Sequence, residues 1–254
     1  MMNFETIILG VEGNVAKIEL NRPETMNALS NKMREELVLA VEEVEKNVEI
    51  RVLVITGKGK AFCAGGDVKG MGTQERPIKP SQIILRLIHL EKPIISAVNG
   101  IAAGGGCNLA LAGDIILASD QARFSQSFVR IGLVPDWGGM YLLPRLVGIA
   151  KAKELMFTGT MIDAREAEKI GLVSKVIPAE EFETAVNGLA KKLASGPPRA
   201  LALSKKILNL GWNLDLASVM ELEYVAQGIC RETEDHKEGL RAFKEKREPR
   251  FVGR

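Results

Sequence analysis

Apolar and polar positions follow two different periods in the first part of the chain. In VAKIEL, residues 15–20, they alternate, which predicts a half-exposed strand before the turn at residues 21–23. Farther along, apolar residues recur at helical spacing with Glu and Lys between them, and Ser30 is a plausible N-cap. This pattern predicts a helix whose buried positions are Met33, Leu37, Val41 and Val44. Residues 51–56 predict the next strand.

The most informative stretch is PIISAVNGIAAGGGCNLALAGD, residues 93–114. Its β-branched run predicts a strand, Asn99-Gly100 signals a tight turn, and glycines 104–106 precede an Ala/Leu-rich segment that predicts a buried helix. The first N–H groups of a helix lack intrahelical partners and carry the positive end of its dipole. They can therefore stabilise a developing negative charge, as in an oxyanion hole. The alternative is that the glycines only allow close packing of the helix on the strand.

A second glycine turn, AFCAGGD at residues 61–67, follows the strand-like run RVLVITG. Two strand ends could then present converging N–H groups, which favours the oxyanion interpretation. A nucleotide site fits less well. The central glycines do not match G-x-G-x-x-G, because Leu109 occupies the last glycine position, and no Gly-Lys-Ser/Thr follows.

The order of elements predicts an α/β core followed by a helical region. A strand at 115–118 and helices near 150–157 and 164–170 continue the alternation that is typical of α/β layers. The Gly-, Pro- and charge-rich residues 70–81 predict a mobile loop that could cover a ligand, before a helix at 82–90. After residue 181 strand signals disappear, and helices are expected at 201–210, 216–232 and 236–246. We therefore expect a core over residues 1–195 and a helical region over 196–254, which either forms a subunit interface or packs on its own core.

Composition argues against several classes of function. Of 254 residues, 46% are hydrophobic and 26% charged, and the formal net charge is +2, so no global field favours nucleic acid or an anionic membrane. No signal peptide or long apolar run is present in the sequence, which predicts a cytoplasmic protein. Three cysteines and two histidines without metal-ligand spacing disfavour zinc and disulfide frameworks, and Cys63 and Cys107 are expected to be small buried residues. The tail RAFKEKREPRFVGR has six basic and two acidic residues, which is typical of a solvated face or, alternatively, of a phosphate site.

Five motifs in order resemble one family over nearly the whole chain. They are NRPETMNALS, AFCAGGDV, AVNGIAAGGGCNLALAGDI, IGLVPDWGGMYLLPRLVG and DAREAEKIGLVSKVI, and together they resemble the crotonase, or enoyl-CoA hydratase/isomerase, superfamily. The resemblance implies a spiral of β-β-α units with C-terminal helices that trimerise, often into a hexamer of two trimers. It implies an acyl-CoA thioester substrate, with coenzyme A present only as part of that substrate and no metal.

The same resemblance assigns residues to the site. The N–H groups of Gly66 and Gly105 would bind the thioester oxygen. Arg22 and basic residues of the tail such as Lys244, from the same chain or a neighbouring subunit, would meet the phosphates. The adenine end would lie along the backbone of Met26, Asn27, Ala28, Leu29, Ala64, Gly65, Gly66 and Asp67.

One departure from the family pattern bears on the reaction. Family hydratases carry two glutamates that hold a water, whereas this chain has Asn108 and Phe128 at those positions. Neither side chain can act as an acid or base, so efficient activation of water through these positions is not available. The turn VPDWG supplies Asp136 instead, where some family isomerases, notably those acting on ring-epoxidised phenylacetyl-CoA, and the 4-chlorobenzoyl-CoA dehalogenase carry an Asp. The alternative role for Asp136 is an Asx-turn or N-cap before a helix that starts near Gly138.

The sequence thus predicts an acyl-CoA isomerase in which Asp136 shuttles a proton and Asn108 is a polar substrate contact. Apolar neighbours such as Phe128, Val134 and Trp137 would raise the pKa of Asp136 above its ordinary value of about 3.9. Remaining alternatives are an enoyl-CoA hydratase, a thioester hydrolase, a dehalogenase with Asp136 as nucleophile, and an acyl-CoA-binding or RNA-binding relative with little turnover.

Overall fold

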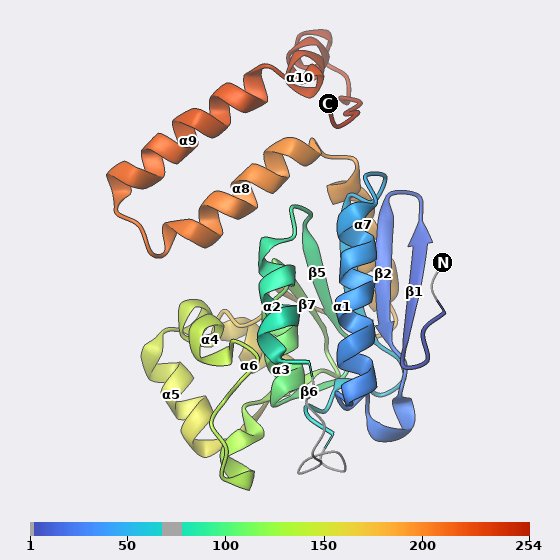
Figure 1. The fold of residues 1–254 in the computed structure, drawn as a ribbon, viewed down its shortest axis with the longest axis vertical. Coiled ribbons are helices and arrows are strands. Elements are labelled where there is room, and N and C mark those ends of the chain that lie inside the picture. The colour runs from blue at the N-terminus through green and yellow to red at the C-terminus, as the bar shows by residue number, and fades with distance from the viewer. Residues whose placement is uncertain (1–2, 68–77) are drawn as a thin grey trace.

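The computed structural model describes residues 3–67 and 78–254, and its centre is a six-stranded sheet (Figure 1). The first strand pairs antiparallel with the second, and every other neighbouring pair is parallel. In spatial order the strands are β1 (Ile7–Glu12), β2 (Val15–Leu20), β3 (Val52–Gly57), β5 (Ile94–Val98), β7 (Ile115–Ser119) and β10 (Lys175–Ile177).

A second sheet of four short strands lies beside the end of the first. Its order is β4 (Ala61–Cys63), β6 (Ile101–Ala103), β8 (Arg123–Ser125) and β9 (Met161–Asp163), and only β9 runs antiparallel to its neighbour. Strands β3, β5 and β7 of the large sheet each lead into one strand of the small sheet before the chain returns through helices. This confirms the predicted α/β class and spiral of β-β-α units. It also corrects one detail, because the Asn99-Gly100 turn leads into β6 before the helix begins.

The core helices that the sequence predicts, α1 (Asn31–Lys46), α2 (Pro80–His89), α5 (Ile149–Thr158) and α6 (Ala164–Lys169), begin and end close to the expected residues, whereas α7 (Phe182–Ala194) was not predicted. Ser30 caps α1 by accepting a hydrogen bond from the Met33 N–H, and the predicted apolar positions of this helix are buried. The predicted loop at 70–81 falls mostly outside the described residues, and its last two residues already belong to α2. The other helices of the core are η1 (Pro23–Thr25), η3 (Ser127–Ile131), α3 (Gly105–Leu111) and α4 (Gly139–Val147).

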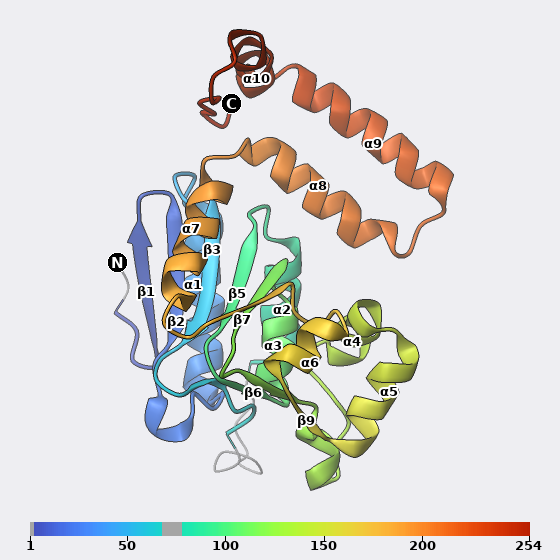
Figure 2. The same ribbon diagram turned by 180° about the vertical axis from the view of Figure 1, so that it is seen from behind.

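Two apolar clusters hold the large sheet between layers of helices. One face, with Leu53, Ile55 and Ile94, packs against α1, α2 and α3. The other face, with Val54 and Ile95, packs against α7 (Figure 2). Side chains alternate between the two faces of a strand, and helices cover both faces of this sheet. Strand β3 is therefore buried along its whole length, and its sequence is a nearly continuous apolar run.

The C-terminal helices project from this core. The residues of α8 (Pro198–Gly211), α9 (Leu216–Arg231) and α10 (Glu234–Glu245) belong to neither apolar cluster of the described chain, and no residue of α9 is buried. Helix α8 leads away from α7, and α9 runs back along α8 (Figures 1 and 2). The division at residue 195 and trimerisation stay predictions.

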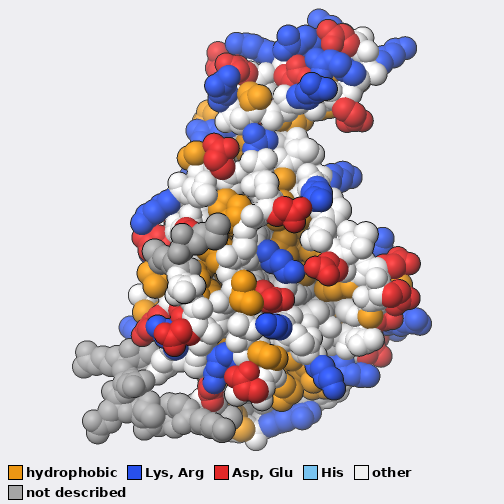
Figure 3. Space-filling view, turned by 90° about the vertical axis from the view of Figure 1, so that its right-hand side faces the viewer, with side chains coloured by type: hydrophobic (Ala, Val, Ile, Leu, Met, Phe, Trp, Pro, Cys, Tyr) orange, Lys and Arg blue, Asp and Glu red, His pale blue; other side chains and the backbone are white. Residues whose placement is uncertain are grey.

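Charges of both signs mix at the α10 end of the molecule (Figure 3). Arg247 forms ion pairs with Glu238 and Glu245, and Arg254 pairs with Glu234. Much of the basic charge of the tail is thus neutralised within the chain. Within the described ranges, none of the helices has both the length and the apolar character needed to cross a membrane.

Candidate active site

The two glycine turns lie side by side at one end of the small sheet. Strands β4 and β6 are parallel neighbours, with Cys63 opposite Ala102, so the turns that follow them leave the sheet at the same edge. A Cβ added at Gly65, where φ is +100°, would lie 2.8 Å from the Ala103 carbonyl oxygen and 3.4 Å from the Gly105 nitrogen. Only glycine permits this approach of one backbone to the other.

Both turns carry backbone donors that no described acceptor uses. The Leu29 N–H donates to the Gly65 carbonyl at 2.8 Å and pairs this segment with the first turn. The N–H groups of Gly66 and Gly105 have no acceptor among the described residues. Two free donors at one sheet edge can hold a negative charge that forms between them. The role of Gly66 and Gly105 as oxyanion donors stays a prediction.

Buried amide side chains hold the turn that carries Asp136. The Asn108 side chain, which has no solvent exposure, donates through Nδ2 to the Asp136 carbonyl oxygen at 2.7 Å. Gln126 Nε2 donates to Asn108 Oδ1 at 2.8 Å, and the Gly139 N–H also donates to the Asp136 carbonyl. Both polar atoms of Asn108 therefore have protein partners, which suits it to positioning Asp136. Its contact with substrate stays a prediction.

Trp137 brings the Asp136 turn against the second glycine turn. A Cβ added at Gly105 would lie 2.9 Å from Trp137 Cδ1, so the indole packs directly on this glycine. Trp137 itself has φ of 51°, an uncommon conformation for a bulky residue that persists only where the surroundings enforce it. Phe128, 9% exposed, approaches the neighbouring Gly104, where a Cβ would lie 3.8 Å from the ring. The structure thus brings Asp136, Gly105 and Phe128 together.

Two opposing effects act on the Asp136 carboxyl group. Partial burial raises its pKa, and the positive charge of Arg34 lowers it by a smaller amount. Asp136 as a whole residue is exposed in the single chain, so the rise reflects packing around the carboxyl group and not enclosure of the residue. The Arg34 guanidinium lies 5.6 Å from the centre of the Trp137 ring. Sequence analysis missed Arg34, because its only local signal is a polar position in the first turn of a helix.

The two cysteines beside the glycine turns are not available as nucleophiles. Cys63 and Cys107 are buried, as expected, and burial raises the pKa of each thiol to about 12. Near neutral pH both stay protonated, and a thiol reacts as its thiolate. Within the described residues, no group of three His, Cys, Asp or Glu side chains could hold a metal ion.

The segment assigned to the adenine end of coenzyme A is tied to the first glycine turn. Met26 is 49% exposed, and its carbonyl accepts a hydrogen bond from the Ala64 N–H. Asn27 has no exposure, accepts from the Arg22 N–H, and donates to the carbonyls of Lys58 and Ala61. Backbone from 26–29 therefore lies beside backbone from 64–67. Adenine binding there stays a prediction.

The residues assigned to the phosphates are widely separated within one chain. Arg22 Nη1 donates to the Ala28 carbonyl at 2.8 Å and forms an ion pair with Asp67 at 2.9 Å, so its charge is partly neutralised. Lys244 lies on α10, at the opposite end of the molecule from α3 (Figures 1 and 2). It could meet a coenzyme A bound at the glycine turns only from a neighbouring subunit. Both assignments stay predictions.

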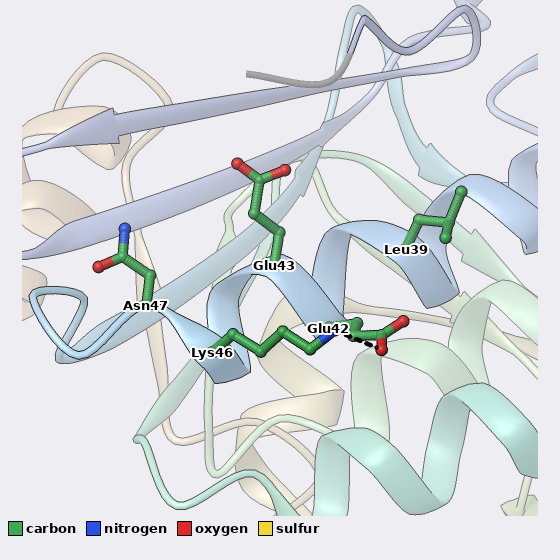
Figure 4. Close-up of a pocket in the computed structure, with 5 residues that line it drawn as sticks. All are labelled: Leu39, Glu42, Glu43, Lys46 and Asn47. Carbon is green, nitrogen blue, oxygen red and sulfur yellow. Dashed lines mark hydrogen bonds and ion pairs between the residues drawn. The ribbon is translucent and has the colours of Figure 1, made fainter.

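A surface hollow of about 310 Å³ on α1 is separate from this site (Figure 4). It is lined by Leu39, Glu42, Glu43, Lys46 and Asn47, in the half of the helix farthest from Ser30. Glu42 and Lys46 neutralise each other in an ion pair of 2.8 Å. The hollow contains no group with the surroundings of a catalytic residue.

Comparison with known proteins identifies the family. The family model described as enoyl-CoA hydratase/isomerase matches residues 10–254. The chain is 42% identical to a short-chain-enoyl-CoA hydratase of Clostridium acetobutylicum, with 97% of each chain covered. It is 36% identical to the 1,2-epoxyphenylacetyl-CoA isomerase of Escherichia coli, with 100% of each covered. An enoyl-CoA hydratase structure from Bacillus anthracis superposes with a TM-score of 0.93 at 37% identity, covering 98% of this chain and 100% of that one. The chain belongs to the enoyl-CoA hydratase/isomerase family of the crotonase superfamily.

Proposed function

We propose that this protein isomerises an unsaturated acyl-CoA, by moving a double bond or opening a ring epoxide, with Asp136 as the proton shuttle. The observation that supports the proposal is the packing of Trp137 on Gly105, because it brings the turn that carries Asp136 against the second glycine turn. The positions that hold two glutamates in family hydratases carry Asn108, which is bonded to the Asp136 turn, and the apolar Phe128.

For a 3-enoyl thioester the reaction requires no water and no net gain of protons. The Asp136 carboxylate removes a proton from the α-carbon, and the electron pair moves onto the thioester oxygen to give a dienolate. The N–H groups of Gly66 and Gly105 bind this oxygen more strongly as its charge grows, which lowers the barrier. The protonated Asp136 then returns the proton to the γ-carbon, and a 2-enoyl thioester results. A raised pKa suits this role, because the carboxylate becomes a stronger base.

Hydration of a 2-enoyl-CoA is the second candidate, and the names of relatives favour it. The relatives from Clostridium acetobutylicum and Syntrophomonas wolfei, 42% and 41% identical, are named as hydratases. Against it, hydration needs one group to activate water and another to protonate the α-carbon. Asn108 and Phe128 cannot do either.

The decisive experiment assays both reactions side by side in the parent protein and in Asp136→Asn. The substitution keeps the shape of the side chain and removes the base, so isomerisation of 3-pentenoyl-CoA should fall by about 10²- to 10⁴-fold. Hydration of 2-pentenoyl-CoA should already be slow in the parent. Asp120→Asn is the matched control, because this exposed aspartate at the end of β7 lies outside the site.

Two results would contradict the proposal. One is rapid hydration of the 2-enoyl ester by a parent protein that leaves 3-enoyl and ring-epoxide esters unchanged. The other is full isomerase activity in Asp136→Asn, which would place the base elsewhere.

A further inference from the structure

Arg34, in the first turn of α1, is a half-buried cation whose donors are unused. Its Nε atom is inaccessible to solvent and has no hydrogen-bond partner. Among the described residues, no hydrogen bond or ion pair involves its guanidinium group. A neighbour on the same helix behaves differently, because Lys32 pairs with both Glu5 and Glu36.

The position of Nε is unfavourable because this donor is shielded from solvent and has no partner among the described residues. Arginine carries five N–H donors, and buried polar groups are normally hydrogen-bonded because an unpaired one loses its hydration without compensation. Burial also disfavours the positive charge of the guanidinium, since it lowers the pKa of Arg34. An arginine extended into solvent would need no such explanation.

The unused donors lie at the candidate active site. The guanidinium is stacked on one side of the Asp136-Trp137 turn, 5.6 Å from the indole centre, and the same indole packs on Gly105. Asp136 does not satisfy it, because the two side chains form no ion pair and interact only at longer range. Among the described residues no carboxylate pairs with this guanidinium, so a substrate anion is a fitting partner for it.

We infer that Arg34 binds a carboxylate at the far end of the acyl group, so that the substrate is the mono-CoA thioester of a dicarboxylic acid. The inference rests on the proposed function only for the position of the acyl group beside Asp136. The planar guanidinium matches a carboxylate in a two-bond geometry that neither lysine nor a neutral donor reproduces. Trp137 holds the guanidinium plane in place through its ring face.

The test measures binding of two saturated thioesters that cannot isomerise. Glutaryl-CoA and pentanoyl-CoA have equal chain length and differ only in the terminal carboxylate or methyl group. Isothermal titration calorimetry of the parent protein should give about 10- to 100-fold tighter binding of glutaryl-CoA, the range typical of hydrogen bonds to a charged group. Arg34→Met should abolish this preference and change pentanoyl-CoA binding much less, whereas Arg34→Lys should keep part of it.

Arg86→Met on α2 is the control for loss of one positive charge, because the Arg86 side chain is 39% exposed and pairs with Glu45 in the last turn of α1. Its preference for glutaryl-CoA should equal that of the parent. Circular dichroism checks the fold, and Arg34→Gln replaces Arg34→Met if the latter does not fold. Equal binding of the two esters by the parent, or equal weakening of both in the Arg34 variants, would overturn the inference. Because neither ester reacts, a failed isomerase assay does not change the binding result. Equal binding of the two esters likewise does not change the result of the isomerase assay.

Discussion

At the scale of single residues, Asp136 differs from a surface aspartate in what contacts its turn. Its carbonyl accepts from Asn108 and Gly139, and the following indole packs on Gly105. The carboxyl group is left to the opposing effects of burial and of Arg34. The protonation of the Asp136 carboxyl group can be measured through the pH dependence of the reaction.

The raised pKa of Asp136 predicts where activity is lost on acidification. The base must be deprotonated, and burial raises its pKa above the ordinary value of 3.8. As pH falls through the raised pKa, kcat/KM for 3-pentenoyl-CoA should decline by about tenfold per pH unit, at a higher pH than an ordinary aspartate would give. A pH–rate profile of the free enzyme measures it.

The substitution Arg34→Gln should shift the acidic limb of the same pH–rate profile. Arg34 lowers the pKa of Asp136, so removing its charge should move the acidic limb to higher pH. The uncharged ester 3-pentenoyl-CoA is used so that binding of a terminal carboxylate does not contribute. An acidic limb at the same pH in parent and Arg34→Gln would show that this charge does not act on the catalytic base.

At the scale of elements, polar contacts anchor the C-terminal helices to the core. Lys205 Nζ on α8 donates to the carbonyls of Leu87 and Lys92 and pairs with Asp114 at 2.9 Å. Asn209 on the same helix donates to the Ile88 carbonyl. Burial lowers the pKa of Lys205 and raises that of Asp114, so burial disfavours both charges. Their mutual contact and the hydrogen bond from the Ile94 N–H to Asp114 oppose this effect.

Lys205→Met should therefore destabilise the protein. The methionine fills much of the volume but leaves Asp114 without its cation. Breaking a fully buried pair from one side costs about 3 kcal/mol in the free energy of unfolding, and a smaller loss is expected here because the Asp114 side chain is 25% exposed. Urea denaturation followed by circular dichroism measures this loss. The double variant Asp114→Asn/Lys205→Met should lose less free energy of unfolding than the two single variants lose together, since no lone charge remains. If Lys205→Met unfolds at the same urea concentration as the parent, the anchor is not where we place it.

At the scale of the whole molecule, a single chain leaves a large apolar surface uncovered on its C-terminal helices. Monomeric proteins rarely expose contiguous apolar patches of this kind. The side chains that are more than half exposed include Leu208, Trp212, Leu216, Met220, Tyr224, Val225 and Phe243.

The resemblance to the crotonase superfamily predicts a trimer or hexamer, which would cover such a surface. Size-exclusion chromatography with light scattering should give three or six times the chain mass of 27.6 kDa. Met220→Glu, a charge on the exposed face of α9, should lower the measured mass without unfolding the core, because the side chain is 57% exposed in the single chain. A monomeric mass for the parent at micromolar concentration would refute this prediction.

Local patterns in the sequence were sufficient for several of the regular elements. Ser30 as a cap, the buried face of α1 and the alternating β2 were all predicted correctly, because capping and periodicity involve neighbours along the chain. The family motifs extended this to the spiral fold and to the two glycine turns. Strands β4, β6, β8, β9 and β10 were missed because three residues are too few to establish a period. The longer elements β1 and α7 were not predicted either.

Contacts between distant residues were decided only by the tertiary structure. Arg34 meets Trp137, Gln126 meets Asn108, and Lys205 meets Asp114 because the order of strands in the two sheets brings their elements together. Each residue looks ordinary within its own segment, and no spacing along the chain links the partners. The sequence alone determined the elements, the family and the replacement of two acidic positions by Asn108 and Phe128. The surroundings that raise the pKa of Asp136, and that give Arg34 no hydrogen-bond partner among the described residues, arise only after folding, since burial and charge depend on neighbours in space.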